Sequence, residues 1–436
     1  MTSPSRLRAL LRQFGQTRRD LGMAVACRTA ARFVLRRVIG RGRGLVGLPR
    51  HGRRGSGRTG YLTGVWTDLA KRDAFCAPEP GHRRRPRIAL IGDLNLPQCR
   101  KYRVEQAGAF WRAQGVALDF AHFEDVPRAV ALLQQATHLM LYRLAAGPQV
   151  SMYLYEARRL GLPVLYDIDD PLFSVPAYAT YGNMAALDDA ARAHFMAEAP
   201  GYLDVMNASD AISVSTPALA RHAAGFTRRP VFLRRNYADP GTLAFRPPER
   251  GTSGVTFRLA FASGSRGHEA DFARIAGPVT SFLRADPARR LMILGHFDKS
   301  RLPAAVRGQV EWHRFTDYAG YLARLARADC AVLPLGNDLF NRCKSGVRAL
   351  DAFAAGCPVI TDPVGDAVSV VEDGETGFVA AGLDGWQRAL EALASAPDRA
   401  RAMGRTARAR LEERWTVSGP APAHVADPEL IRWVTA

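Results

Sequence analysis

The stretch from Ala331 to Ala380 constrains the fold of this chain more than any other. It predicts a strand at Ala331–Leu335, a loop, a helix at Ser345–Ala355 and a second strand at Pro358–Asp362. Both apolar runs are short and contain β-branched residues, which is typical of parallel strands buried on both faces. Gly356 stands where a glycine commonly ends a helix. The stretch therefore predicts a β–α–β unit of a parallel sheet.

Polar residues gather where this helix is predicted to begin. Ser345 is a candidate N-cap, so the free backbone N–H groups face a loop that also carries Asn341 and Lys344. A helix start at the carboxyl end of a parallel strand suits a phosphate or diphosphate. Asp351, farther along the same helix, is placed to accept hydrogen bonds from a ribose diol. The alternative is that Lys344 is an ordinary surface charge and Asp351 a solvated helix acid.

The run FNRCKSGVRALDAFAAGCPVITDPVG, followed by VEDGETGFVA, resembles the donor half of GT-B glycosyltransferases of the family 4 type. The resemblance implies two Rossmann-like α/β domains facing a cleft, with a nucleoside diphosphate sugar as donor and a hydroxyl as acceptor. It also implies that Lys344 and Arg266 stabilise the diphosphate leaving group without a metal. The family's distal acidic residue is Asp351 here, whereas its proximal one falls on Cys343 or Gly346.

Composition is compatible with a two-domain enzyme. The chain has 436 residues and is 47% hydrophobic, which is enough for two cores. Its six cysteines show neither metal-ligand spacing nor the density of a disulfide scaffold, so we expect a reducing cytoplasm. No apolar run approaches the length of a membrane-spanning helix, and the start of the chain lacks the apolar core of a signal peptide.

The net charge of +19 is concentrated at one end. Residues 1–86 hold 20 Lys and Arg against 4 Asp and Glu, so a basic extension precedes a nearly neutral body. Residues 1–45 have leucine, valine and phenylalanine at helical spacing among arginines. Such a helix is able to lie on an anionic membrane surface at the inner face of the membrane. It could equally contact RNA or pack on the body of the protein.

Residues 87–245 are predicted to form the first, acceptor-binding domain. Short apolar runs alternate with helical segments, as in a parallel sheet with right-handed crossovers. No GxGxxG follows the first run, which disfavours a classical dinucleotide fold. The predicted strands are Arg87–Asp93, Leu118–His122, His138–Arg143, Val164–Asp170 and Ala211–Ser215.

Two segments of this domain carry the resemblance further. They are CRKYR at Cys99–Arg103 and YDIDDPLF at Tyr166–Phe173. In a GT-B chain the second segment ends at the cleft, where Asp169 is predicted to orient an acceptor hydroxyl or to act as base; a turn or cap role before Pro171 is the alternative. Although Asp167 and Asp169 spell a DxD, we predict no metal there because the nucleotide signature lies in the other half. The predicted acceptor contacts are Arg100, Tyr102, Arg103 and Arg143.

Residues 246–418 are predicted to form the donor domain, with residues 419–436 as a tail. A strand at Arg258–Ala262 leads into the small-residue loop Ser263, Gly264, Ser265 and Arg266, whose backbone is able to approach a phosphate; a plain surface turn is the alternative. The SGS-then-His pattern resembles the first donor-domain loop of some polysaccharide-assembly transferases, with His268 and Asp271 at matching positions. The resemblance also implies a contact with the nucleotide base from Trp312 or Phe315.

The sequence thus predicts a metal-independent glycosyltransferase that needs no cofactor beyond its nucleotide-sugar co-substrate. The expected acceptors are saccharides or lipid-linked saccharides, as in the assembly of surface polysaccharide or glycolipid. Two other classes stay open. The missing proximal carboxylate would suit a non-catalytic GT-B-like binding or scaffold protein. The pI near 10.3 suggests a nucleic-acid binder, but the chain has no recognised RNA or DNA motif and we expect no such partner.

Overall fold

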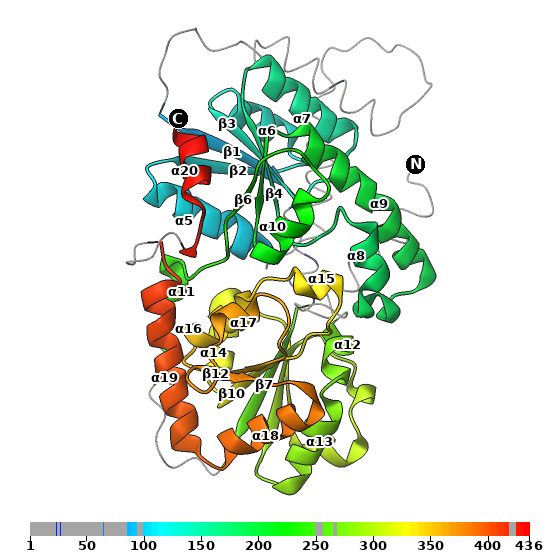
Figure 1. Cartoon of the computed structure of the whole chain (residues 1–436), viewed down its shortest axis with the longest axis vertical. Helices are drawn as coiled ribbons and strands as arrows, with labels where there is room; N and C mark the ends of the chain where they lie inside the picture. Colours follow the sequence, from blue (N-terminus) through cyan, green and yellow to red (C-terminus); the bar gives the residue numbers. More distant parts are fainter. Residues whose placement is uncertain are drawn as a thin grey trace.

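The computed structural model describes residues 85–93, 99–248, 256–264, 268–417 and 424–436, together with the single residues 23, 27 and 64. The predicted basic extension and the loop residues Ser265 and Arg266 therefore lie outside the described residues. Figure 1 shows two α/β domains, one above the other, each built around its own parallel sheet. This confirms the predicted fold class.

The first sheet has the strand order β2-β1-β3-β4-β5-β6 and is parallel throughout. Its central strands are buried on both faces, which explains their continuous apolar sequence. The strands are β1 (Arg87–Gly92), β2 (Ala117–His122), β3 (His138–Tyr142), β4 (Val164–Ile168), β5 (Ala211–Val214) and β6 (Val231–Leu233).

Helices cover both faces of this sheet, and one pair extends beside the second domain. In Figure 1, α8 and α9 run down the right-hand side of the molecule, next to the junction between the domains. Ser174 caps α8 and Asp188 caps α9, each accepting a hydrogen bond from a backbone N–H. The helical segments are η1 (Arg100–Glu105), α5 (Gln106–Ala113), α6 (Val126–Leu133), α7 (Pro148–Arg159), α8 (Val175–Thr180), η2 (Gly182–Ala186), α9 (Asp189–Ala208), α10 (Pro217–Ala224) and α11 (Pro240–Ala244).

The second sheet repeats this design with the order β12-β11-β10-β7-β8-β9. The stretch Ala331–Ala380 contributes its β10–α16–β11 unit, and Gly356 ends the helix with φ of +65°. The strands are β7 (Arg258–Ser263), β8 (Arg290–Gly295), β9 (Val310–His313), β10 (Cys330–Leu333), β11 (Val359–Thr361) and β12 (Gly377–Val379).

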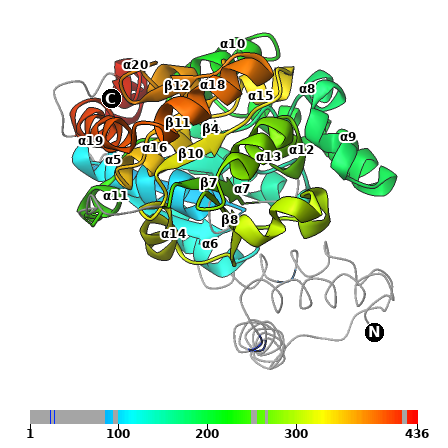
Figure 2. The same cartoon turned by 90° about the horizontal axis from the view of Figure 1, so that it is seen from below.

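The helices of the second domain surround its sheet, as the view in Figure 2 shows. Two of them, α18 and α19, lie at the carboxyl-terminal end of this domain and pack against the preceding unit through Trp386, Leu390 and Leu411. The helical segments are α12 (His268–Ala273), α13 (Ala276–Ala285), η3 (Lys299–Arg301), η4 (Ala304–Gln309), α14 (Tyr318–Leu325), α15 (Leu339–Arg342), α16 (Val347–Ala354), α17 (Ala367–Val370), α18 (Gly382–Ala394) and α19 (Pro397–Arg414).

Three local expectations are corrected by the structure. The predicted loop before Lys344 contains a short helix, α15, which begins after the cap Asp338. Helix α16 begins at Val347 with Gly346 as its N-cap, so Ser345 lies one residue outside it. The predicted loop reaching Arg103 is already helical from Arg100. The start of α16 differs by two residues, as the ends of helices often do, whereas α15 is a separate short helix whose cap Asp338 lies inside the predicted loop.

The chain returns to the first domain at its end. Helix α20 (Pro428–Thr435) packs on that domain through Leu430 and Val434, and Asp427 accepts a hydrogen bond from Leu233 N at 2.6 Å. Among the helices of the described residues, none is both long and apolar enough to cross a membrane.

Candidate active site between the domains

The carboxyl ends of the two sheets meet at the interdomain junction. The chain beyond β5 contacts the chain beyond β10, because Thr216 Oγ1 donates a 2.9 Å hydrogen bond to the carbonyl of Cys343. Next to it, Gly182 N donates to Asp338 at 3.4 Å. In open parallel sheets this edge is where ligands bind. The predicted donor and acceptor residues are therefore brought to one region from both halves of the chain.

Lys344 lies at this junction, as the sequence predicts. Its Nζ donates a 2.7 Å hydrogen bond to the hydroxyl of Tyr181 and sits 4.7 Å from the centre of that ring. The ring of Tyr181 stacks on Phe340 with 4.1 Å between centroids and 9° between planes. Burial raises the pKa of the Tyr181 hydroxyl, although Lys344 opposes this. The ammonium group of the donor domain is thus held against an aromatic wall that includes a residue of the first domain.

A second cation, Arg348, follows on α16 and was not predicted. Its Nη1 lies 3.4 Å from the carbonyl oxygen of Ala262, which it can reach as a hydrogen-bond donor at the end of β7. Ser263 and Gly264 begin the predicted phosphate loop next to this contact. The sequence contains no signal for the pair of Lys344 and Arg348, because residues four apart share a side only within one helix and Lys344 precedes α16.

Phe315 lies near the same strand ends. Gly295 ends β8 with φ of +110°, and a Cβ there would lie 2.2 Å from the carbonyl oxygen of Ser263. Only glycine permits this close approach. Phe315 is partly exposed and stacks with His296 at 6.1 Å between centroids. Trp312 packs against the core beside Phe297, so of the two aromatic candidates Phe315 is the one at this edge.

Asn341 and Ser345, on either side of the Lys344 segment, hydrogen-bond to other parts of the protein. Asn341 is fully buried, and its Nδ2 donates to Asp338 at 2.7 Å. The hydroxyl of Ser345 accepts from Asn236 Nδ2 at 2.9 Å and from Val347 N at 3.2 Å. In this structure both side chains hydrogen-bond to neighbouring segments, and their direct contact with a diphosphate stays a prediction.

Asp351 also has different partners from the ribose that the sequence suggested. One carboxylate oxygen accepts from the Tyr102 hydroxyl at 2.6 Å and the other from the Tyr318 hydroxyl at 2.7 Å. The side chain is buried, which raises the pKa of Asp351 to about 6. Tyr102 belongs to the first domain, so this carboxylate joins the two domains. The predicted contacts of Asp351 with a ribose and of Tyr102 with an acceptor stay predictions.

Of the other three predicted acceptor residues, Arg143 lies at the junction, whereas Arg100 and Arg103 lie elsewhere in the first domain. Arg103 is fully buried and bonds to Asp167, at 2.5 Å from Nη2 and 3.0 Å from Nε. Arg100 points toward β2, over the ring of Phe120 at 5.0 Å. Neither lies at the junction, because successive residues of the η1 turn point in different directions. Arg143, by contrast, remains at the strand end predicted for it.

Arg143 connects the two acids that end β4. Its Nη1 lies 3.3 Å from Asp169 and 3.4 Å from Asp170. Burial raises the pKa of Asp170, although the charges of Arg143 and Lys344 oppose this. The Tyr142 hydroxyl lies 3.3 Å from Asp169. Asp169 is therefore placed at the junction as predicted, with Asp170 as a second acid on the side of Lys344.

The DxD does not form a metal site in this structure. The carboxylate of Asp167 is fully buried and bonds to both Arg103 and Arg234, so it points away from Asp169. Across the described ranges, no three His, Cys, Asp or Glu side chains gather in a way that could hold a metal ion. The acid within the apolar strand VLYDI was the available signal, since a buried carboxylate needs a buried cation.

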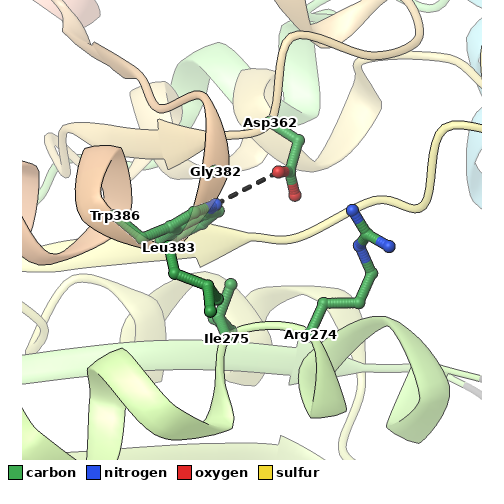
Figure 3. Close-up of a pocket in the computed structure, with 6 residues that line it drawn as sticks. All are labelled: Arg274, Ile275, Asp362, Gly382, Leu383 and Trp386. Atoms are coloured by element: carbon green, nitrogen blue, oxygen red, sulfur yellow. Dashed lines mark hydrogen bonds between the residues drawn. The ribbon is translucent and has the colours of Figure 1, made fainter.

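The second domain also has a cavity of about 220 Å³, and Figure 3 shows the residues that line it. It lies between α12, β11 and α18, and Arg274 points across it toward Asp362. The Asp362 carboxylate accepts from Trp386 Nε1 at 3.1 Å and from Leu335 N at 2.9 Å. None of the predicted site residues lines it, and its acid is already hydrogen-bonded to the core. We therefore assign the site to the junction.

Comparison with known proteins agrees with this geometry. A family model described as glycosyl transferase-like matches residues 278–421, within the second domain and the start of the tail. A D-inositol 3-phosphate glycosyltransferase of Arthrobacter is 31% identical over 234 residues, 48% of this chain and 52% of that protein. A glycogen synthase of Mycobacterium tuberculosis is 36% identical over 113 residues, 25% of this chain and 26% of that protein. The chain thus spans a quarter to a half of these relatives.

Solved structures share the fold. A sucrose-phosphate synthase from Thermosynechococcus elongatus superposes with a TM-score of 0.51 at 16% identity, covering 75% of this chain and 94% of that one. A glycosyltransferase from Rickettsia africae superposes with a TM-score of 0.50 at 8% identity, covering 81% of this chain and 99% of that one. The chain therefore shares the two-domain GT-B fold of these structures, and residues 278–421 resemble a glycosyl transferase-like domain.

Proposed function

We propose that this protein transfers a sugar from a nucleoside diphosphate sugar to a hydroxyl acceptor. The observation that carries the proposal is the pair Lys344 and Arg348 at the carboxyl edge of the second sheet, beside the loop that begins at Ser263 and Gly264. Two cations at the carboxyl edge of a parallel sheet suit a diphosphate. The aromatic ring of Phe315, near the same strand ends, suits a nucleotide base.

The chemical task of the two cations is electrostatic. When the glycosidic bond breaks, negative charge develops on the diphosphate, and groups fixed in advance stabilise that charge without reorganising. Since Lys344 and Arg348 supply positive charge at this point, we propose that the transfer needs no divalent metal. Asp169 lies across the junction and serves as the group that orients the acceptor hydroxyl or takes its proton.

The acceptor class follows from the resemblance and from the basic extension. We propose a saccharide or a lipid-linked saccharide, as in surface polysaccharide or glycolipid assembly. The excess of arginine in residues 1–86 would then hold the enzyme at the inner, anionic face of the membrane. The body of the protein would stay in the cytoplasm, attached peripherally.

Donor hydrolysis tests the proposal without knowledge of the acceptor. The protein is incubated with a panel of nucleoside diphosphate sugars, and release of the nucleoside diphosphate is measured with and without EDTA. Lys344→Ala should lower kcat/KM about 10- to 150-fold, because a charge-assisted contact contributes about 1.5–3 kcal/mol. EDTA should have no effect. Arg342→Ala is the matched control, since Arg342 is an exposed cation two residues away.

Three outcomes would contradict this proposal. Binding of a nucleotide-sugar with no hydrolysis and no transfer would indicate a scaffold protein. Equal turnover by the wild type and Lys344→Ala would show that the site is wrongly assigned. Loss of activity in EDTA with recovery in manganese would overturn metal independence.

A further inference from the structure

His268, Asp271 and Asn183 form a chain of three side chains that crosses between the domains. Asn183 lies in η2 of the first domain, and its Nδ2 donates to Asp271 Oδ2 at 2.9 Å. The same oxygen lies 3.2 Å from Nδ1 of His268, at the start of α12 in the second domain. Asp271 is 1% exposed and Asn183 is 4% exposed. The three side chains thus form a buried polar contact between the two domains.

The carboxylate decides which nitrogen of the imidazole carries the proton. Burial alone would raise the pKa of Asp271, but the hydrogen bond from His268 and the charge of Lys344 outweigh it, so the pKa lies below its usual value. An ionised Asp271 accepts from Nδ1–H. The Nε2 atom of His268 is then the ring atom left for a ligand, and it has a lone pair when the ring is neutral.

Two cations face the ring from the donor site. Burial, Arg348 and Lys344 hold the pKa of His268 down, to about 4, despite the bond to Asp271. Asp271 acts on the ring in the opposite direction, and the neutral hydroxyl of Tyr181 lies on the side of the first domain. A diphosphate that binds Lys344 and Arg348 brings negative charge to this position. It therefore favours the protonated ring, which a free site disfavours.

We propose that His268 is a catalytic residue that takes up a proton when the donor binds and presents Nε2–H to the leaving diphosphate. This inference rests on the proposed function. The C–O bond to the diphosphate breaks and its electron pair stays on the diphosphate oxygen, which receives the Nε2 proton. The acceptor oxygen forms the new C–O bond and releases its proton to Asp169. Asp271 and Asn183 are positioning residues, and since Asn183 comes from the other domain, the chain is complete only when the domains are closed.

Proton uptake measures the first half of this step directly. UDP, GDP and ADP are each titrated into the full-length protein at pH 7, by calorimetry in two buffers of different ionisation enthalpy. For whichever diphosphate binds, the wild type should take up about one proton more than His268→Gln. Because both proteins are titrated with the same ligand, the difference between them excludes the protons that the ligand itself takes up or releases. His194→Gln is the matched control, because His194 is 62% exposed on α9 and should behave as the wild type.

The second half is tested by donor hydrolysis as a function of pH. His268→Gln should lower kcat by about 100-fold, the lower end for general acid–base groups, and should flatten the pH profile. Asn183→Ala should lower kcat far more than it raises KM and should shift the profile, which a loss of packing alone would not do. Asp271→Asn gives a second variant of the relay if His268→Gln does not fold.

The outcomes separate this inference from the proposed function. If the wild type and His268→Gln take up equal numbers of protons while Lys344→Ala still loses turnover, the transferase site stands and the role of His268 is wrong. An unchanged pH profile in both His268→Gln and Asp271→Asn would overturn it as well. If no nucleoside diphosphate or donor sugar binds to the wild type, the proposed function fails first.

Discussion

The buried carboxylate of Asp351 gives a prediction whose size follows from the structure. Its pKa is raised to about 6 from an ordinary 3.8, mainly by burial and against the hydrogen bonds of Tyr102 and Tyr318. At 1.36 kcal/mol for each tenfold change in a proton equilibrium, keeping this group ionised costs the folded protein about 3 kcal/mol. The carboxylate is therefore a source of instability at neutral pH, in spite of its two hydrogen bonds.

The sign of the pH dependence follows from linkage. The folded-state pKa of Asp351 is above the unfolded-state value, so the folded state binds the extra proton. The contribution of this group to stability is complete below pH 3.8 and is lost as pH rises through about 6. Asp351→Asn has the same shape, and its amide is able to hydrogen-bond to both tyrosine hydroxyls. The variant should therefore be more stable than the wild type at pH 8, with no such gain at pH 4.

Thermal unfolding at pH 4 and pH 8 provides the measurement. The difference in apparent Tm between Asp351→Asn and the wild type should be larger at pH 8 by about 5–10 °C, given 2–4 °C per kcal/mol for a domain of this size. Asp384→Asn, an exposed acid on α18, is the control and should show no such difference. A variant that is destabilised equally at both pH values would refute the reasoning.

The same variant decides between the observed and the originally predicted partner of Asp351. If the carboxylate acts only between Tyr102 and Tyr318, donor affinity should stay within about twofold of the wild type. A loss of tenfold or more, about 1.4 kcal/mol, would restore the ribose contact that the sequence suggested.

Three further results are expected. Asp167→Asn should destabilise the first domain by about 3–5 kcal/mol in urea unfolding, because it leaves two buried arginines without their counterion, whereas Asp169→Asn should be nearly neutral. Gly365→Ala should weaken donor binding, because Gly365 has φ of +70° and a Cβ there would lie 2.9 Å from the carbonyl oxygen of Asn341 and 3.3 Å from that of Lys344. An unchanged donor affinity in calorimetry would show that this contact with the Lys344 segment does not affect the site. The full chain should sediment with anionic vesicles at low salt but neither at high salt nor with neutral vesicles, and salt-independent binding would exclude the electrostatic role proposed for residues 1–86.

Local sequence determined the architecture of this protein because its signals lie within one helix or strand. Short apolar runs marked strands β1–β5, β7, β10 and β11, and Gly356 marked the end of α16, where its φ is positive. Asp169 was predicted because it follows a strand directly, and Lys344 because it precedes the helix that follows the strand predicted at Ala331–Leu335 in the second domain. The carboxyl ends of parallel strands lie at one edge of a sheet. Such inferences need no knowledge of which strand lies beside which.

Only the tertiary structure decided which side chains meet across the chain. Tyr102 and Asp351 are 249 positions apart, and Asn183 and Asp271 are 88 apart. Neither pair shows in helix or strand periodicity, because each contact depends on how two separately folded domains face one another. The same holds for Arg103, which the sequence predicted to contact the acceptor in the cleft. The buried carboxylate of Asp167 holds it in the core, since an ion pair out of water is stable only when both partners stay together.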